Sequence, residues 1–202
     1  MTTPAPDRTR YQEKLTRDNA ALILIDYLTG FDPGLKTIEP QTYRHNVTAL
    51  IQIGQIFKLP TIVLGDEGGF RGNFYPELAQ YLPDAPRVAR HTPSAWDEPA
   101  FVKAVEATGR RKLIVAGISL DNCLMMLSID AMRAGYEIYA VVDASGTDHP
   151  LVEQAAMMRL SQAGAVMTSW VSLASELLKD WETPEGPLVG KLYQDHSSWG
   201  GK

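Results

Sequence analysis

The stretch KLIVAGISLDNCLMMLSIDAMRAG, residues 112–135, decides the fold of this 202-residue chain. Its opening part, residues 113–116, is a short uninterrupted apolar run, which is typical of a strand buried on both faces of a parallel sheet. Gly117 ends the run, and from Leu124 onward apolar residues return at helical spacing. The stretch therefore predicts a buried strand that passes directly into an amphipathic helix.

Cys123 lies at this junction and is the only cysteine of the sequence. The short polar side chain of Asp121 or Asn122 is expected to cap the helix. A thiol in the first turn of a helix feels the positive end of the helix dipole, which favours the thiolate. Free cysteines are also among the most buried residues. Position alone therefore leaves a nucleophile and a small buried side chain as alternatives.

Strand and helix signals alternate through the rest of the chain. Further strands are predicted at 20–25, 61–64, 88–90, 137–142 and 165–169. Further helices are predicted at 43–57, 76–82, 97–109, 149–163 and 173–181. This order predicts a three-layer α/β/α fold with a central, mostly parallel sheet of about six strands. We expect one domain over residues 1–202, with an N-terminal arm at 1–17 and a C-terminal tail at 183–202 that is ordered only by packing on a neighbour.

Composition narrows the class of protein. With 45% hydrophobic and 21% charged residues, the chain has the make-up of a globular protein. A net charge of −5 argues against nucleic acid or an anionic membrane as a partner. One cysteine excludes an internal disulfide and fits a reducing compartment. Because no 18-residue apolar span occurs either, we expect a cytoplasmic protein that acts on a small molecule.

Reactive side chains follow the predicted strands. They are Asp26, Asp66, Arg90, Cys123 and Asp143. In open parallel sheets ligands bind outside the carboxyl ends of the strands, so these groups are expected on one rim. Arginine stays protonated, which limits Arg90 to an electrostatic role: holding Cys123 as thiolate and orienting Asp26. Asp26 as a structural cap and Arg90 as a surface ion pair remain alternatives.

The sequence resembles the isochorismatase-like cysteine hydrolases, in particular their YcaC-like branch. An aspartate after the first strand, a cation at the end of the third, and GISLDNC at 117–123 carry the resemblance. Other matching segments are IEP at 38–40, LPTI at 59–62, PDAP at 83–86, AWD at 95–97, FVKAV at 101–105, VDASGT at 142–147 and RLSQAGA at 159–165. The resemblance covers roughly residues 12–190, and so many segments in this order make it specific.

The resemblance implies a catalytic set. Asp26 corresponds to the general base and acid, and Cys123 to the nucleophile. Arg90 stands where the family usually has a lysine. The family also has a cis peptide before the cysteine, which here would be Ile118–Ser119. This bond would aim the Ser119 N–H, together with the Cys123 N–H, at one point as an oxyanion hole.

The resemblance also bears on the pocket and on bound groups. Expected pocket residues are Phe31, Glu67, Trp96 and Asn122. Nicotinamidase relatives carry an Asp-x-His metal site at the position of Asp66, but no histidine follows here, so neither a metal nor a cofactor is expected. The family commonly forms oligomers, and the tryptophans of the C-terminal region suit subunit contacts. They are Trp170, Trp181 and Trp199.

Two functions remain in competition. The first is a hydrolase that cleaves a C–N bond of a small amide-like substrate through a thioacyl-enzyme. Relatives that hydrolyse vinyl ethers lack the cysteine, so its presence argues for thioacyl chemistry. The second is a non-catalytic flavodoxin-like module that binds a ligand or senses redox state through its thiol. The pH dependence of Cys123 alkylation discriminates them.

Overall fold

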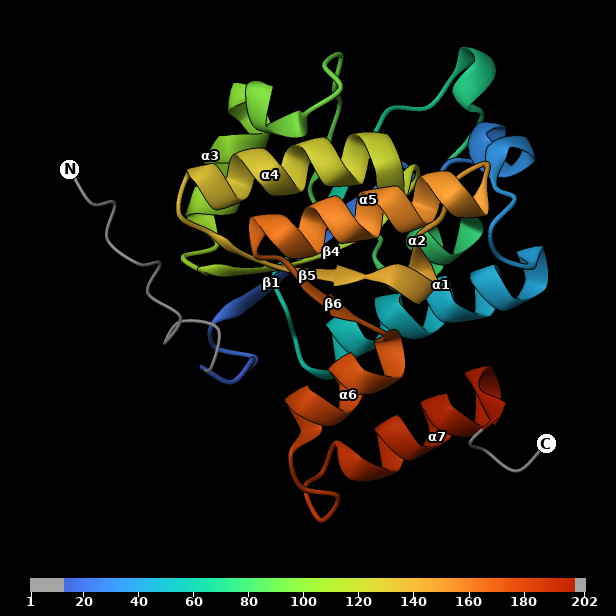
Figure 1. Ribbon diagram of the computed structural model, residues 1–202. Helices are drawn as coiled ribbons and strands as arrows, with labels where there is room; N and C mark the ends of the chain where they lie inside the picture. The colour runs from blue at the N-terminus through green and yellow to red at the C-terminus, as the bar shows by residue number, and fades with distance from the viewer. Residues whose placement is uncertain (1–12, 199–202) are drawn as a thin grey trace.

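The fold is built on one sheet, seen in a computed structural model that describes residues 13–198 (Figure 1). Its six strands are all parallel and lie in the order β3-β2-β1-β4-β5-β6. The strands are β1 (Ala20–Ile25), β2 (Thr61–Leu64), β3 (Arg87–Val88), β4 (Lys112–Gly117), β5 (Glu137–Val141) and β6 (Val166–Thr168). The prediction of a six-stranded parallel sheet is confirmed.

Helices cover both faces of this sheet. They are α1 (Pro40–Ile56), α2 (Pro76–Tyr81), α3 (Pro99–Ala107), α4 (Met125–Arg133), α5 (Pro150–Ala163), α6 (Trp170–Leu178) and α7 (Gly186–His196). The helices α1, α2, α6 and α7 pack on one face, and α3, α4 and α5 pack on the other (Figure 1). The result is the expected three-layer α/β/α arrangement. Within the described part of the chain, no helix is long and apolar enough to cross a membrane.

The central strands are apolar throughout because both of their faces are covered. Leu22 and Leu24 of β1 point into the core beneath α1, whereas Ile23 and Ile25 point into the core beneath α3 and α4. All six residues of β1 are buried, as are all six of β4. Each large aliphatic side chain buried in this way contributes about 1.5–3 kcal/mol. The ends of these two strands are therefore firmly placed, and they carry the reactive groups.

Both terminal segments differ from the prediction. Leu15, in the expected arm, is fully buried, and its N–H donates to the Glu176 carboxylate at 2.9 Å. The expected tail contains α7, which packs on α1 and α6 through Val189 and Leu192. The glycine and proline content of this segment concealed the helix, because proline is well tolerated in a first helical turn. The remainder of the arm and tail, residues 1–12 and 199–202, lies outside the described residues.

The tryptophans of the C-terminal region have different environments. Trp170 is 2% exposed, and its indole N–H donates to Asn46 Oδ1 at 2.9 Å. Its expected role in subunit contacts is therefore wrong, because the ring is part of the core of the subunit itself. Trp181 is 54% exposed and stays available for such a contact. Trp199 lies outside the described residues.

Candidate active site

Asp26 lies directly after β1 and is only 2% exposed. Its backbone is left-handed, with φ of 52°, which turns the chain out of the sheet. Aspartate tolerates this conformation better than most residues. Two glycines allow neighbouring strands to end close beside it. A Cβ on Gly65 would lie 2.9 Å from Asp26 Oδ1, and one on Gly117 would lie 2.0 Å from the Ile25 carbonyl oxygen. The sequence therefore builds a tight pocket around this carboxylate.

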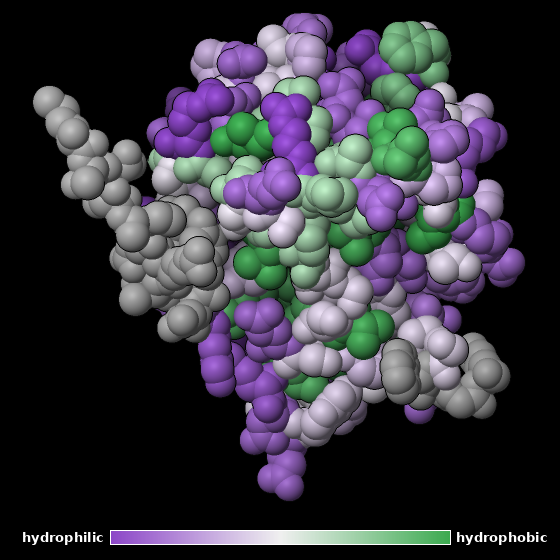
Figure 2. Space-filling view, viewed as in Figure 1, coloured by the Kyte–Doolittle hydropathy of each residue, from purple (hydrophilic) through white to green (hydrophobic). Residues whose placement is uncertain are grey.

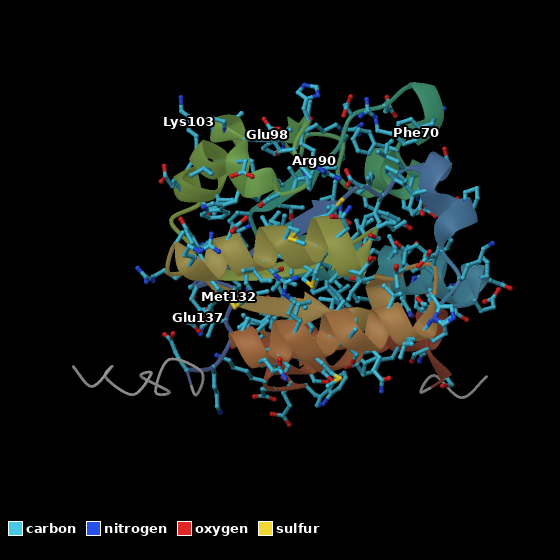
Figure 3. The ribbon with its side chains drawn as sticks, turned by 45° about the horizontal axis from the view of Figure 1, so that its top comes forward. Phe70, Arg90, Glu98, Lys103, Met132 and Glu137 are labelled. Carbon is cyan, nitrogen blue, oxygen red and sulfur yellow. The ribbon has the colours of Figure 1, made fainter. Side chains whose placement is uncertain are left out.

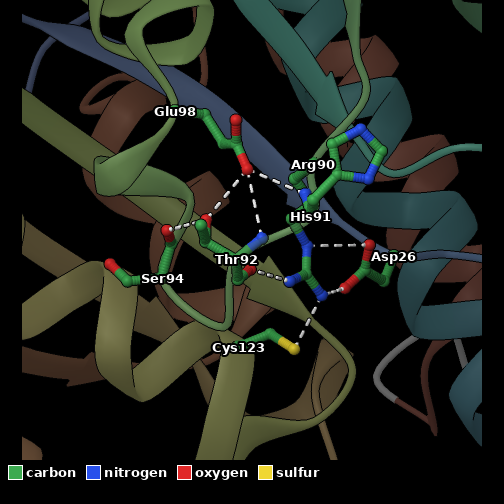
Figure 4. A network of polar contacts seen from close by, with 7 residues as sticks. All are labelled: Asp26, Arg90, His91, Thr92, Ser94, Glu98 and Cys123. Carbon is green, nitrogen blue, oxygen red and sulfur yellow. Dashed lines mark hydrogen bonds and ion pairs between the residues drawn. The ribbon is translucent and has the colours of Figure 1, made fainter.

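Arg90 joins Asp26 to Cys123. Its Nη2 donates to Asp26 Oδ2 and, at 2.7 Å, to Cys123 Sγ, as the dashed lines in Figure 4 show. Its Nε lies 3.3 Å from Asp26 Oδ1, and its Nη1 donates to the Thr92 carbonyl oxygen at 2.6 Å. The three residues predicted from separate strands thus form one cluster. Arg90 itself is in a loop, because β3 ends at Val88 and not at residue 90 as predicted.

Cys123 lies in a single π-helical turn, Leu120–Leu124, that precedes α4. Such turns recur at functional sites. The expected cap is wrong, because Ser119 occupies the N-cap position and makes no capping bond with its side chain. The Asp121 carboxylate instead accepts a hydrogen bond from Thr147 Oγ1 at 2.6 Å. The turn is therefore tied to the loop that follows β5.

The electrostatics favour a thiol that is activated by its neighbour. Burial raises the pKa of Asp26 above its ordinary value, with Arg90 opposing the shift. Burial likewise raises the pKa of the Cys123 thiol, against the lowering effect of Arg90. Desolvation of the sulfur therefore opposes the thiolate that Arg90 favours. The Asp26 carboxylate and Cys123 Sγ share the same Arg90 donor, which places the carboxylate beside the thiol whose proton it would take.

The backbone before Cys123 supplies a further donor. The Ile118–Ser119 peptide bond is cis, in agreement with the expectation. Ile118 N–H donates to the Ile25 carbonyl oxygen at 3.1 Å, which fixes this segment to the end of β1. The backbone N–H of Ser119 acts to lower the pKa of the Cys123 thiol. It is therefore a backbone donor close to the reacting atom.

A cavity of about 350 Å³ opens onto these groups. It is lined by Asp26, Phe31, Asp66, Phe70, Arg71, Arg90, His91, Thr92, Pro93, Asn122 and Cys123. Phe31 and Asn122 were expected there, but Glu67 and Trp96 do not line it. Glu67 accepts from the Phe74 N–H at 2.8 Å and so closes its own loop. Trp96 packs edge-on against aromatic rings of the core.

The glycine-rich loop 65–72 contributes Asp66, Phe70 and Arg71 to the cavity lining, and Arg71 is the one that sequence reasoning missed. Phe70, which Figure 3 shows on the same side as Arg90, is 77% exposed. Its ring lies edge-on to that of Phe31, with the two ring centroids 6.1 Å apart. Arg71 pairs with Asp66 at 2.7 Å. The glycines predicted a loop over the site but not which side chains it turns inward. Among the described residues, no group of three potential metal ligands occurs.

A second cavity, of about 430 Å³, adjoins the first. Its lining residues are Phe31, Gly34, Ile118, Ser119, Asp121, Asn122, Thr147 and Asp148. Phe31 and Asn122 line both cavities, so these two side chains form the boundary between them. The site therefore has one compartment on the Asp26 side and another on the Ser119 side.

Asp143 does not belong to this site, although it too follows a strand. Its Oδ1 accepts from the Trp170 N–H at 3.0 Å, which ties the end of β5 to the start of α6. Burial raises the pKa of Asp143 to about 6. Asp143 follows the carboxyl end of a parallel strand, as predicted for the rim, but its carboxylate bonds the start of α6 and does not line the cavity.

The raised pKa of Asp143 predicts a stability change with pH. The folded chain binds this proton up to a pH of about 6, whereas the unfolded chain releases it near its usual pKa of about 3.9. The free energy of unfolding should therefore fall by about 3 kcal/mol as pH rises through this window. In Asp143→Asn this component should vanish, since the amide oxygen still accepts from Trp170. Urea unfolding from pH 3.5 to 7 measures it, with the exposed Asp84→Asn as control. Equal slopes in Asp143→Asn and the parent would contradict it.

Comparison with known proteins agrees with this architecture. The isochorismatase domain matches residues 20–172. The chain therefore belongs to the isochorismatase family of hydrolases.

Within this family, the chain is similar to proteins named YcaC. The chain is 38% identical to the probable hydrolase YcaC of Escherichia coli K12 over 186 residues, which cover 91% of this chain and 88% of that protein. The crystal structure of E. coli YcaC, described as an octameric hydrolase of unknown specificity, matches with a TM-score of 0.87 and 36% identity over 96% of this chain and 93% of that one. YcaC from Pseudomonas aeruginosa, solved with hexane-2,5-diol and covalent acrylamide, matches with a TM-score of 0.87 and 37% identity over 91% and 92%.

Proposed function

We propose that the protein is a cysteine-dependent hydrolase that cleaves a C–N bond of a small amide-like substrate through a thioacyl-enzyme. The observation that carries the proposal is the contact of one Arg90 nitrogen with both the Asp26 carboxylate and Cys123 Sγ, at the wall of a cavity. A base, a sulfur nucleophile and a cation in mutual contact are the components that acyl transfer needs.

Acylation begins with transfer of the Cys123 thiol proton to Asp26. Asp26 accepts the thiol proton as Cys123 Sγ forms a bond to the substrate carbonyl carbon. The Ser119 and Cys123 N–H groups hold the oxyanion that develops. Asp26 then gives its proton to the departing nitrogen, the C–N bond breaks, and an amine or ammonia leaves. The raised pKa of Asp26 suits a group that must both accept and return a proton near neutral pH.

Deacylation repeats the sequence with water. Asp26 accepts a proton from the water that attacks the thioester carbonyl carbon. The tetrahedral intermediate collapses, the C–S bond breaks, and the proton returns to Cys123. Arg90 cannot exchange its proton at working pH, so it stabilises Asp26 and the sulfur as charges throughout. The net reaction consumes one water and gives an acid and an amine.

The relatives supply independent support. Acrylamide, held covalently by the Pseudomonas protein, is a small amide whose double bond reacts with thiolates. A small ligand of this size suits a cavity of about 350 Å³. Cys123 is the only cysteine of this chain and so the only thiol that could react in this way.

We also propose that the chain assembles into a homo-oligomer. The E. coli relative is octameric. On α5 only Ala156 and Leu160 are buried. Its large exposed apolar residues are Leu151, Val152 and Met158. Figure 2 shows apolar side chains among polar ones on the face that α4 and α5 form. Apolar side chains gathered in this way are typical of subunit contacts.

A panel of small amides and imides tests the catalytic proposal. The purified protein is expected to release ammonia or amine from at least one of them, and release should stop after alkylation of Cys123. A different result would favour the redox module: no compound turned over, together with reversible oxidation of the thiol. That outcome would overturn the hydrolase proposal.

A further inference from the structure

Arg90 is placed by something other than the sheet. The strand β3 has two residues and ends at Val88, whose carbonyl oxygen accepts the last ladder bond, from the Gly65 N–H at 3.0 Å. Arg90 is two residues further on. A long, flexible side chain on a loop needs other contacts to hold a single orientation.

Glu98 provides those contacts from the start of α3. Its Oε1 accepts from the His91 N–H at 2.7 Å, from the Thr92 N–H at 3.1 Å and from Thr92 Oγ1 at 3.0 Å (Figure 4). Although Glu98 occupies the N-cap position of α3, its carboxylate makes no capping bond there. The side chain therefore serves the loop and not its own helix.

The loop in turn holds the guanidinium of Arg90. The Thr92 carbonyl oxygen accepts from Arg90 Nη1 at 2.6 Å. Because the guanidinium is planar and its donors form a rigid fork, fixing Nη1 leaves Nε and Nη2 directed at Asp26 and Cys123.

The same loop is fastened to the helix that follows the nucleophile. Thr92 Oγ1 lies 2.6 Å from the Ser94 carbonyl oxygen. Ser94 is only 5% exposed, and its hydroxyl donates at 2.7 Å to Asp130 Oδ2 on α4. The loop that orients Arg90 and the helix that begins after Cys123 are thus held in one frame.

We propose that Glu98 is a positioning residue for the catalytic cluster, acting through the 91–92 loop to hold Arg90 against Asp26 and Cys123. The inference depends on the proposed function only for the role of Arg90 in catalysis. Because Cys123 alkylation can be measured without any substrate, this inference and the hydrolase proposal can fail separately.

The test compares Cys123 alkylation by iodoacetamide in Glu98→Ala, Arg90→Gln and the double variant. The charged and titratable groups that line the cavity together with Cys123 are Asp26, Asp66, Arg71, Arg90 and His91. Arg90→Gln should slow alkylation at pH 8 about tenfold. Loss of the cation should raise the pKa of Cys123, and a rise of about one unit lowers the thiolate fraction about tenfold. Glu98→Ala should slow it about three- to tenfold in the Arg90 protein and have no further effect in Arg90→Gln.

The sign of the effect separates positioning from simple electrostatics. Removing a negative charge near the thiol would, by Coulomb interaction alone, ease thiolate formation and speed alkylation. Positioning predicts slower alkylation. Glu98→Gln, which keeps an acceptor oxygen, should stay close to the parent. The matched control is Glu106→Ala, an exposed glutamate on the same helix.

Two outcomes would overturn the proposal. One is a Glu98→Ala protein whose alkylation profile equals that of the parent or is faster. The other is an equal loss in both the Arg90 and Arg90→Gln backgrounds, which indicates a general structural effect. Thermal unfolding checks that the variants are folded. If Glu98→Ala does not fold, Glu98→Asp replaces it, and its shorter side chain is expected to slow alkylation by a smaller factor. A Glu98→Asp protein that is not slowed would equally overturn the proposal.

Discussion

The Cys123→Ala variant is expected to lose amide hydrolysis by at least about 10⁴-fold. Without Sγ no thioacyl intermediate can form, and the sequence holds no second cysteine to replace it. The fold should be unaffected, because the side chain lies at the wall of a cavity and is not fully buried. Amine release and circular dichroism on the same preparation measure both points.

Cys123→Ser is the companion variant. A serine hydroxyl keeps nearly the same shape but ionises far less readily than a thiol, so it should also be close to inactive. Parental turnover in the alanine variant would show that the sulfur takes no part in the chemistry, whatever its contacts.

Asp26→Asn is expected to lower kcat/KM for the same substrate by about 10²- to 10⁴-fold. The amide can neither accept the thiol proton nor return it to the leaving nitrogen. The negative charge of Asp26 also raises the pKa of Cys123. Its removal should therefore make alkylation of Cys123 faster while hydrolysis becomes slower. Iodoacetamide kinetics and steady-state turnover, measured in parallel from pH 6 to 10, reveal this separation.

Asp66→Asn is the matched control for that experiment. Asp66 lines the same cavity, but its carboxylate pairs with Arg71. We expect a change of less than about tenfold in kcat/KM, as for a group outside the proton path. Equal losses in the Asp26 and Asp66 variants would mean that cavity charge, and not a proton acceptor, supports the reaction.

The fold was largely predictable from the sequence because burial on both faces leaves a plain signal. The run at 20–25 matches β1 residue for residue, and the run at 61–64 matches β2. Helix α7 was not predicted because its two glycines and its proline are typical of loops. Gly186 sits where a Cβ would lie 2.0 Å from the Trp181 carbonyl oxygen, a packing reason that pattern alone does not reveal.

The sequence predicts which reactive residues follow the strands, but not which of their side chains meet in one site. Asp26 and Asp143 look alike in sequence, since each follows an apolar run. In the structure one backbone is left-handed and turns its carboxylate to Cys123, while the other carboxylate bonds the first N–H of α6. The role of Glu98 depends on three hydrogen bonds to a loop six and seven residues earlier. No spacing rule predicts such contacts.

Rapid-quench mass spectrometry of the intact protein during turnover tests the central claim most directly. With an amide that the enzyme hydrolyses, the account predicts a transient mass increase equal to the acyl group, which peptide mapping places on Cys123. The adduct should decay at the rate at which acid product appears. Product formation without any adduct, or with an adduct on another residue, would contradict a thioacyl-enzyme at Cys123.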